Sequence, residues 1–282
     1  MLLKLYLLPL FFLFLTIGKA QPDDREICHR TFSFAFEHKL IDKPIGEVIT
    51  AIGKQFLNAP YEAGTLEHAD SEKLVVNLYS FDCVTFVENI VAISCCVKSN
   101  RLSFDEYQKE LQALRYRNGV VNGYVSRLHY FSDWIEDNER KGVVKNISQE
   151  LGGKPYKKIL NFMTSHRSKY RQLVNDSVFH ILKTIEDSLS THRIFFIPKS
   201  KIKNLQSKIP NGAIIAITTD ETGLDVAHTG IAVRLDDGTL HYLHAPNVKG
   251  VVKVSKETLA EYIQHHRHFT GIIVVEVKEP QE

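Results

Sequence analysis

The pattern of apolar and polar positions divides the chain into a helix-rich part followed by a strand-rich part. In the first part apolar residues recur at steps of three and four, which is the period of one buried helix face. Helices are therefore expected within 25–57, from 83 to about 95, at 104–114 and at 170–189. A loop at 58–64 and a β-prone run at 73–78 separate the first two of these helical segments.

From residue 193 onward, short β-prone runs alternate with turn signals such as Asp236-Asp237-Gly238. Strands are expected at 194–197, 213–218, 227–235, 240–245, 251–254 and 271–277, with one helix at 256–266. Helices first and strands afterwards predict an α+β fold with an antiparallel sheet. We expect one domain over 21–282, helix-rich at 21–192 and strand-rich at 193–282.

The first twenty residues have the pattern of a secretory signal. Lys4 gives a charged start, 5–17 is apolar, and Gly18 and Ala20 place small residues at the cleavage-site positions. The apolar stretch is shorter than the roughly 20 residues that a membrane-spanning helix needs. The chain is therefore predicted to be exported, periplasmic or secreted, with a mature chain that begins near Gln21 and has no membrane contact.

Charge and cysteine content narrow the class of protein. The net charge is +2, with acids and bases mixed along the chain, whereas a nucleic-acid binder concentrates basic residues in a stripe. We expect a monomer that binds no nucleic acid. Four cysteines are too few for a disulfide scaffold. If Cys83 stays free, Cys28 with Cys95 or Cys96 is the plausible bridge.

Cys83 is the candidate nucleophile because it follows Ser80-Phe81-Asp82, which is typical of a helix start. The N–H groups and the positive dipole end of a helix stabilise a thiolate over a thiol, and they can also hold an oxyanion. The alternative is that Cys83 is a small buried hydrophobe, as many cysteines are. A catalytic role therefore requires a base elsewhere in the chain.

His228 is the candidate base. It begins a predicted strand and shares one face with Gly230 and Ala232, whose small size leaves room beside the imidazole. An Asp-Gly turn joins this strand to the next, and the resulting hairpin places His244 near His228. His241 is an odd number of residues from His244 and should face the other way.

A zinc site is the competing interpretation of these histidines. It would use His228, His241 and His244, but His241 is expected on the wrong face. No His-Glu-x-x-His helix and no paired Cys-x-x-Cys spacing occurs in the sequence. We therefore expect neither a metal nor another cofactor.

Several short motifs, in order, resemble a known group of enzymes. Asp82-Cys83, His228-Thr229-Gly230 and His244-Ala245, with Pro60-Tyr61 upstream, resemble the NlpC-type papain-like cysteine hydrolases of bacterial cell walls. The segments 82–88, 115–119 and 126–130 are similar to the N-acetylmuramoyl-L-alanine amidase-like branch of that superfamily. The likeness runs from about Ala51 to Val277.

This resemblance implies a papain-like fold, in which a helix carrying the nucleophile packs on the sheet, and hydrolysis of the amide between the lactyl group of N-acetylmuramic acid and L-alanine. The substrate would be peptidoglycan fragments, with 1,6-anhydro-muropeptides as one candidate. Cys83 would attack, His228 would carry the proton, and His244 would orient the imidazole. Two alternatives stay open: a D-glutamyl-diaminopimelate endopeptidase and a non-catalytic cell-wall binding protein.

Substrate recognition is expected mainly between residues 115 and 134, where arginines can bind carboxylates and aromatic rings can face a sugar. The expected binding residues are Tyr61, Asp82, Arg115, Asn118, Tyr124, Ser126, Arg127 and His129. Tyr61 is also a candidate second oxyanion donor beside the Cys83 N–H. In the alternative interpretation, the helical spacing of Tyr130, Phe131 and Trp134 makes these rings part of the core.

Overall fold

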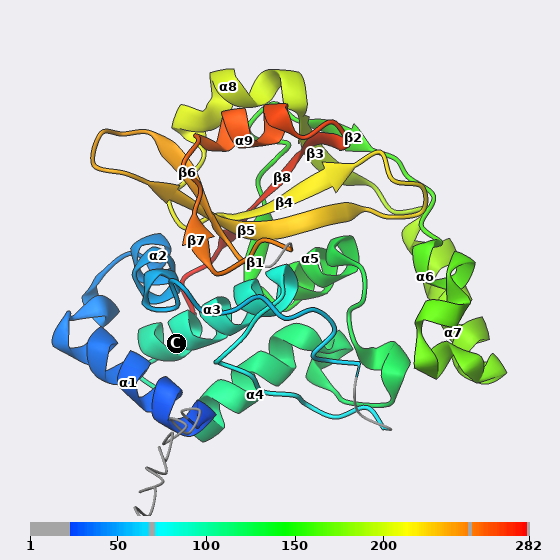
Figure 1. Ribbon diagram of the computed structural model, residues 1–282, viewed down its shortest axis with the longest axis horizontal. Coiled ribbons are helices and arrows are strands. Elements are labelled where there is room, and N and C mark those ends of the chain that lie inside the picture. The colour runs from blue at the N-terminus through cyan, green and yellow to red at the C-terminus, as the bar shows by residue number, and fades with distance from the viewer. Residues whose placement is uncertain (1–22, 68–70, 248–249, 281–282) are drawn as a thin grey trace, which may run out of the picture.

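The computed structural model describes residues 23–67, 71–247 and 250–280, so the predicted signal segment lies outside the described residues. The centre of the fold is one sheet with the strand order β2-β3-β8-β4-β5-β6-β7, and β1 pairs with β8 (Figure 1). Every pair of named strands is antiparallel. The strands are β1 Val144–Asn146, β2 Lys154–Tyr156, β3 Ile194–Pro198, β4 Ile214–Thr219, β5 Val226–Arg234, β6 Leu240–His244, β7 Lys253–Val254 and β8 Phe269–Val277.

Helices cover both faces of the sheet. The longer helices α1 to α5 lie on one face, α8 and α9 on the other, and α6 and α7 stand at one end (Figure 1). They are α1 Asp24–Glu37, α2 Ile45–Gln55, α3 Cys83–Lys98, α4 Phe104–Arg115, α5 Phe131–Arg140, α6 Phe162–Ser165, α7 Asp176–Leu189, α8 Ile202–Leu205 and α9 Leu259–His265. The predicted α+β class and antiparallel sheet are confirmed.

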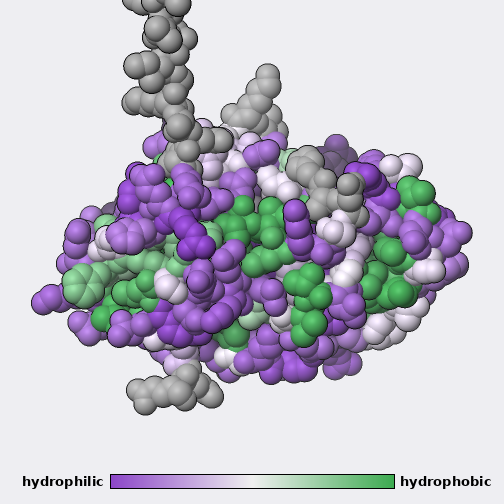
Figure 2. All heavy atoms as spheres, turned by 90° about the horizontal axis from the view of Figure 1, so that it is seen from below, coloured by the Kyte–Doolittle hydropathy of each residue, from purple (hydrophilic) through white to green (hydrophobic). Residues whose placement is uncertain are grey.

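Helix α3 is the centre of the helical layer. Its residues from 85 to 97 are all buried, because α2, α4 and β5 pack around it. The sequence predicted that only one face of this helix would be buried. The helix is instead enclosed on every side, which is possible because it carries few polar residues. Seen from below, the molecule is mostly hydrophilic and its hydrophobic patches are separated by polar groups (Figure 2).

Three expectations about secondary structure are corrected. The run 73–78 forms no strand; instead, the Val75 carbonyl accepts a 2.5 Å hydrogen bond from the Arg115 guanidinium. A side chain thus provides the hydrogen bond that a neighbouring strand was expected to provide. The three-residue strands β1 and β2 were not predicted, because their length gives no measurable alternation. Residues 170–175 precede α7 rather than belong to it.

The aromatic residues at the start of α5 lie in the core, as the helical-spacing alternative predicted. Tyr130, Phe131 and Trp134 are buried, and the rings of Phe131 and Trp134 stack with centroids 5.0 Å apart.

All four cysteines are free thiols, so the expected bridge from Cys28 to Cys95 or Cys96 is wrong. Cys28, Cys95 and Cys96 are buried within one hydrophobic cluster between α1 and α3, where they pack as small apolar side chains. Burial raises the pKa of Cys28 and of Cys96 to about 12, which keeps both thiols protonated.

Arg115 lies inside the helical layer rather than on a substrate-facing surface. Its Nε donates a 2.7 Å hydrogen bond to Glu88 on α3, and each side chain is only 2% exposed. Burial raises the pKa of Glu88, and the charge of Arg115 opposes this shift. The predicted role of Arg115 in binding a substrate carboxylate is therefore replaced by a structural one.

Replacing Arg115 with Met should lower the free energy of unfolding by about 3–5 kcal/mol, because Glu88 would keep a buried charge without a partner. Urea unfolding followed by circular dichroism measures this. Arg101→Met is the control, since Arg101 is 43% exposed in its contacts with Glu106 and Glu110 and should change stability by less than about 1 kcal/mol. Equal losses in the two variants would contradict the assignment.

Candidate active site

Cys83 occupies the first position of α3, as the sequence predicted. Asp82 caps the helix: its Oδ1 accepts hydrogen bonds from the N–H groups of Val84 (3.0 Å) and Thr85 (2.7 Å). In return, Thr85 Oγ1 accepts a 2.9 Å hydrogen bond from the Asp82 N–H. Asp82, expected as a substrate ligand, therefore orders the helix end, and Cys83 remains partly accessible.

Strand β5 holds this helix end in place. Thr229 Oγ1 donates a 2.7 Å hydrogen bond to the carbonyl of Cys83. Along β5, Ile231 packs in the cluster with α3, whereas Ala232 packs in the cluster under α8 and α9. By the same alternation, Thr229 faces α3 and His228 belongs to the opposite face, at the same end of the strand.

His228 and His244 are in direct contact, which confirms the pairing predicted from the hairpin. Nε2 of His228 lies 2.7 Å from Nδ1 of His244. Ile231 pairs with Leu243, so His244 falls opposite Gly230 and diagonally across from His228 on one face. The two imidazoles are 6% and 1% exposed.

Two tyrosines contact the histidine pair and also respond to the charge of Cys83. The Tyr242 ring stacks on His244 at 4.8 Å, and Tyr262 meets His244 edge-to-face at 5.2 Å. Burial raises the pKa of Tyr61 and of Tyr262 to about 12 and that of Tyr242 further, and negative charge on Cys83 contributes to each shift. The charge state of Cys83 thus affects the same two rings, Tyr242 and Tyr262, that contact His244.

Two of these tyrosines, and the role of Thr229, were missed by the sequence reasoning. Tyr242 could have been found, since it precedes His244 by two residues and shares its face of β6. Tyr262 lies on α9, and no local pattern connects it to the histidines.

The protonation state of the pair differs from the one expected. Burial raises the pKa of Cys83 to about 11; the charge of Asp82 adds to this, and hydrogen bonds from Thr229 oppose it. Burial lowers the pKa of His228 to about 4, with a contribution from His266. The helix end alone was expected to favour a thiolate, but desolvation outweighs it, so at neutral pH the site holds a thiol and a neutral imidazole.

The contact between the histidines also fixes the tautomers that would permit catalysis. If His228 is to accept a proton at Nδ1, its Nε2 must carry hydrogen and donate to Nδ1 of His244. His244 then carries its own hydrogen on Nε2, which is buried and has no hydrogen-bond partner among the residues that the structure describes. His244 can thus orient His228 without competing for the thiol proton.

His241 lies apart from this pair, as predicted. Its Nδ1 is 2.9 Å from the Ser255 carbonyl and its Nε2 is 3.0 Å from Thr239 Oγ1. Among residues 23–67, 71–247 and 250–280, no group of three or more His, Cys, Asp or Glu could hold a metal ion. The zinc interpretation therefore has no geometry to support it.

Tyr124 and Arg127 are engaged by the protein itself. Both are buried, and Arg127 Nη2 lies 2.6 Å from Glu67 while the Tyr124 hydroxyl donates to the same carboxylate at 3.2 Å. The Arg127 guanidinium also lies over the Tyr124 ring at 5.0 Å. These contacts attach the segment around 66 and 67 to the 124–127 turn, so Arg127 has an internal counter-charge.

The other residues expected to bind substrate also have internal partners. Ser126 Oγ donates to the Gly123 carbonyl at 2.7 Å, and His129 Nε2 lies 2.8 Å from the Tyr124 carbonyl. Burial lowers the pKa of His129 to about 3. Asn118 is exposed, but its Oδ1 accepts a 2.8 Å hydrogen bond from Arg140. Of the expected set, Tyr61 and Asp82 are the two residues that these observations link to Cys83.

Comparison with known proteins connects this arrangement to a family. Residues 51–272 match the sequence profile of the AmiA-like family, described as N-acetylmuramoyl-L-alanine amidase-like. An N-acetylmuramoyl-L-alanine amidase from Bacteroides uniformis is 37% identical, with a TM-score of 0.79 over 83% of this chain and 99% of that one. A search among proteins with curated functions found no match.

Two further structures are similar. A Bacteroides fragilis protein described provisionally as a xylanase is 37% identical, with a TM-score of 0.75 over 80% of this chain and 99% of that one. A Legionella pneumophila protein matched to the family DUF1460 is 21% identical, with a TM-score of 0.70 over 92% of this chain and 95% of that one. The second likeness concerns the fold alone.

His228 should titrate near pH 4 in the folded protein and near its ordinary value of 6.5 in the urea-unfolded chain. The unfolded chain then binds more protons between these values, so the free energy of unfolding should fall as the pH drops through this window. NMR of ¹³C-labelled histidine measures the titration, and a His228→Asn variant identifies the signal. A pKa at or above 6.5 would indicate an imidazolium paired with a thiolate and would contradict the neutral pair.

Proposed function

The chain belongs to the N-acetylmuramoyl-L-alanine amidase-like family of hydrolases, and from this we propose that it cleaves the amide joining the lactyl group of N-acetylmuramic acid to L-alanine in peptidoglycan fragments. The observation that carries the proposal is the 2.7 Å contact between His228 and His244, one residue along β5 from the Thr229 hydroxyl that donates to the Cys83 carbonyl. Cys83, His228 and His244 are the residue types that covalent amide hydrolysis uses as nucleophile, base and orienting group.

The first half of the reaction transfers the acyl group to sulfur. As Cys83 Sγ attacks the amide carbon, its proton passes to Nδ1 of His228, and the imidazolium is stabilised through its Nε2–H donated to His244. The tetrahedral intermediate collapses, the C–N bond breaks, and His228 delivers the proton to the departing amine of L-alanine. The sugar side remains as a thioester on Cys83.

The second half releases the product acid. Water gives its proton to His228 and attacks the thioester, the C–S bond breaks, and His228 returns the proton to the leaving sulfur to restore the thiol. In both halves the negative oxygen needs donors. Val84 and Thr85 use their N–H groups on Asp82, which leaves the Cys83 N–H for the oxyanion, and the Tyr61 hydroxyl is the second donor that we propose.

The other activities considered fit the site less well. A xylanase needs two carboxyl groups flanking a glycosidic bond, whereas this site presents a thiol and two imidazoles, and Asp82 caps α3. A non-catalytic binding protein would not need an accessible thiol beside a buried histidine pair. A D-glutamyl-diaminopimelate endopeptidase would use the same three residues, and only the bond cleaved separates it from an amidase.

We further propose that the protein acts as an exported monomer, periplasmic or secreted, with one domain over 21–282 and with no cofactor. The N-terminal sequence pattern supports export. Within the described ranges, no helix is long and apolar enough to cross a membrane.

Incubation with 1,6-anhydro-muropeptides, followed by mass spectrometry, should show release of a peptide with a free L-alanine amine. Cys83→Ala should lower the turnover rate by about 10³-fold or more, because the covalent route is lost. Cys28→Ala removes a buried thiol far from the histidines and should leave the rate within a few-fold of wild type.

Three results would contradict parts of the proposal. Cleavage after D-glutamate would show the endopeptidase activity instead. Full activity in Cys83→Ala would overturn the nucleophile, and intact muropeptides together with an unreactive Cys83 thiol would overturn the enzyme itself.

A further inference from the structure

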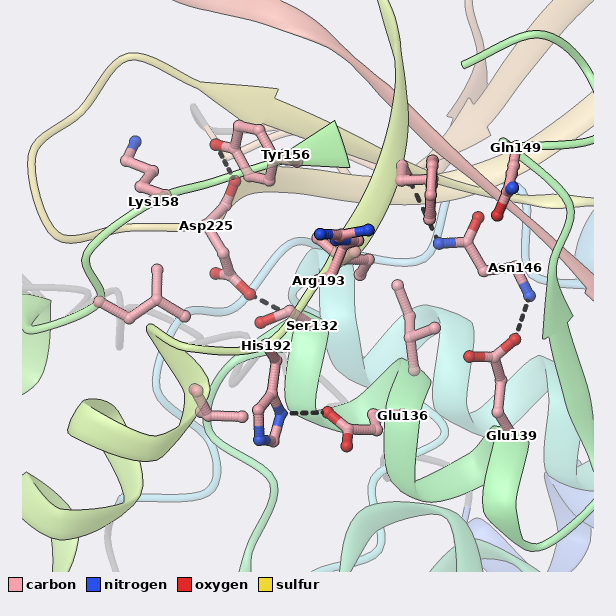
Figure 3. A pocket seen from close by; sticks show the side chains of 15 residues that line it. Ser132, Glu136, Glu139, Asn146, Gln149, Tyr156, Lys158, His192, Arg193 and Asp225 are labelled. Carbon is pink, nitrogen blue, oxygen red and sulfur yellow. Dashed lines mark hydrogen bonds and ion pairs between the residues drawn. The ribbon is translucent and has the colours of Figure 1, made fainter. Parts of the chain in front are cut away.

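A second polar pocket lies away from the candidate active site, between α5, β3 and the end of α7 (Figure 3). Its volume is about 510 Å³, within the range of roughly 300–1,000 Å³ that is typical of small-molecule sites. Cys83, His228 and His244 are not among the residues that line it. Any ligand it takes would thus bind apart from the thiol.

Charged side chains of both signs line this pocket. Lys158 donates to the Thr219 carbonyl and Asp225 accepts from the Ser132 N–H, so both have partners within the protein. Arg193 lies on the β3 side, and Glu136 and Glu139 lie one helical turn apart on α5 (Figure 3). In the described part of the chain, the Arg193 guanidinium has no ion pair or hydrogen bond. The Arg193 guanidinium therefore keeps its donors available for a carboxylate of a ligand.

Each of the two glutamates has a hydrogen-bond partner that holds its side chain in place, but neither forms an ion pair with Arg193. Glu136 Oε2 lies 2.6 Å from Nδ1 of His192, and Glu139 Oε1 accepts a 2.6 Å hydrogen bond from the Asn146 N–H. Each carboxylate keeps its other oxygen without a partner among the described residues. These second oxygens can accept hydrogen bonds from an ammonium group, which has three N–H donors and no acceptor.

Part of the wall between the charged groups is apolar. Ile135, Leu160, Leu189 and Phe195 contribute side chains to it. Such a wall favours a ligand with an apolar side chain between its charged ends. At about 3.3–3.6 Å per extended residue, a chain of two or three residues separates its amine from its carboxylate by roughly 7–11 Å, the length scale of a pocket of about 510 Å³.

We propose that this pocket binds a short zwitterionic peptide, with its free amine on Glu136 and Glu139 and its carboxylate on Arg193. The pocket is open to solvent, so each charged contact is partly screened and the affinity should be modest, with a Kd of roughly 0.1–1 mM. The inference does not require the proposed amidase reaction, since it concerns binding alone.

Calorimetry with the full chain carrying Cys83→Ala tests the proposal without turnover. The probe is L-alanyl-L-leucine, and its N-acetyl and C-terminal amide derivatives each lack one charge. Arg193→Gln should weaken binding of the free dipeptide by about tenfold but leave binding of the amide derivative unchanged. Glu139→Gln should weaken binding of the dipeptide but not of the N-acetyl derivative.

Lys208→Gln is the matched control, because it removes one exposed positive charge away from the pocket and should leave the Kd within twofold. Equal melting temperatures would show that the variants are folded. The proposal is overturned if L-alanyl-L-leucine does not bind at millimolar concentration. It is also overturned if the Arg193 and Glu139 variants bind it as well as the control does.

Discussion

The docking of the first turn of α3 against β5 is the constraint on which the candidate site depends. One hydrogen bond, from Thr229 to the carbonyl of Cys83, joins the helical layer to the sheet where the thiol begins the helix. Asp82 fixes the backbone of that turn from the other side. Enclosure of the rest of α3 prevents the helix from sliding along the strand, so the position of Cys83 is set by packing along the whole helix.

Burial governs the electrostatics of this protein more than helix dipoles do. The same desolvation raises the pKa of the thiol, lowers those of the two histidines, and makes the Arg115–Glu88 pair a structural element. A neutral thiol–imidazole pair reacts only when a substrate carbonyl is in place to receive the electrons as the proton moves. Such a pair is less exposed to adventitious oxidation than a permanent thiolate would be.

Local signals in the sequence were enough to predict that Cys83 begins a helix and that His228 and His244 lie together. A capping residue identified the start of α3, and strand alternation with one Asp-Gly turn brought His228 and His244 together. What failed depended on distant partners. Arg115 looks like a ligand until Glu88, 27 residues away, is found beside it. Tyr262 reaches the site only because α9 packs over β6. The run at 73–78 forms no strand because side chains, such as that of Arg115, bind its backbone carbonyls.

The alternation of β5 has a mechanical consequence. Thr229 is hydrogen-bonded to the backbone of Cys83, the candidate nucleophile, and the residue directly before it is His228, the candidate base. A displacement of β5 therefore carries the backbones of both candidate residues in the same direction. Their relative position thus depends on one strand and one hydrogen bond rather than on the rigidity of the surrounding loops.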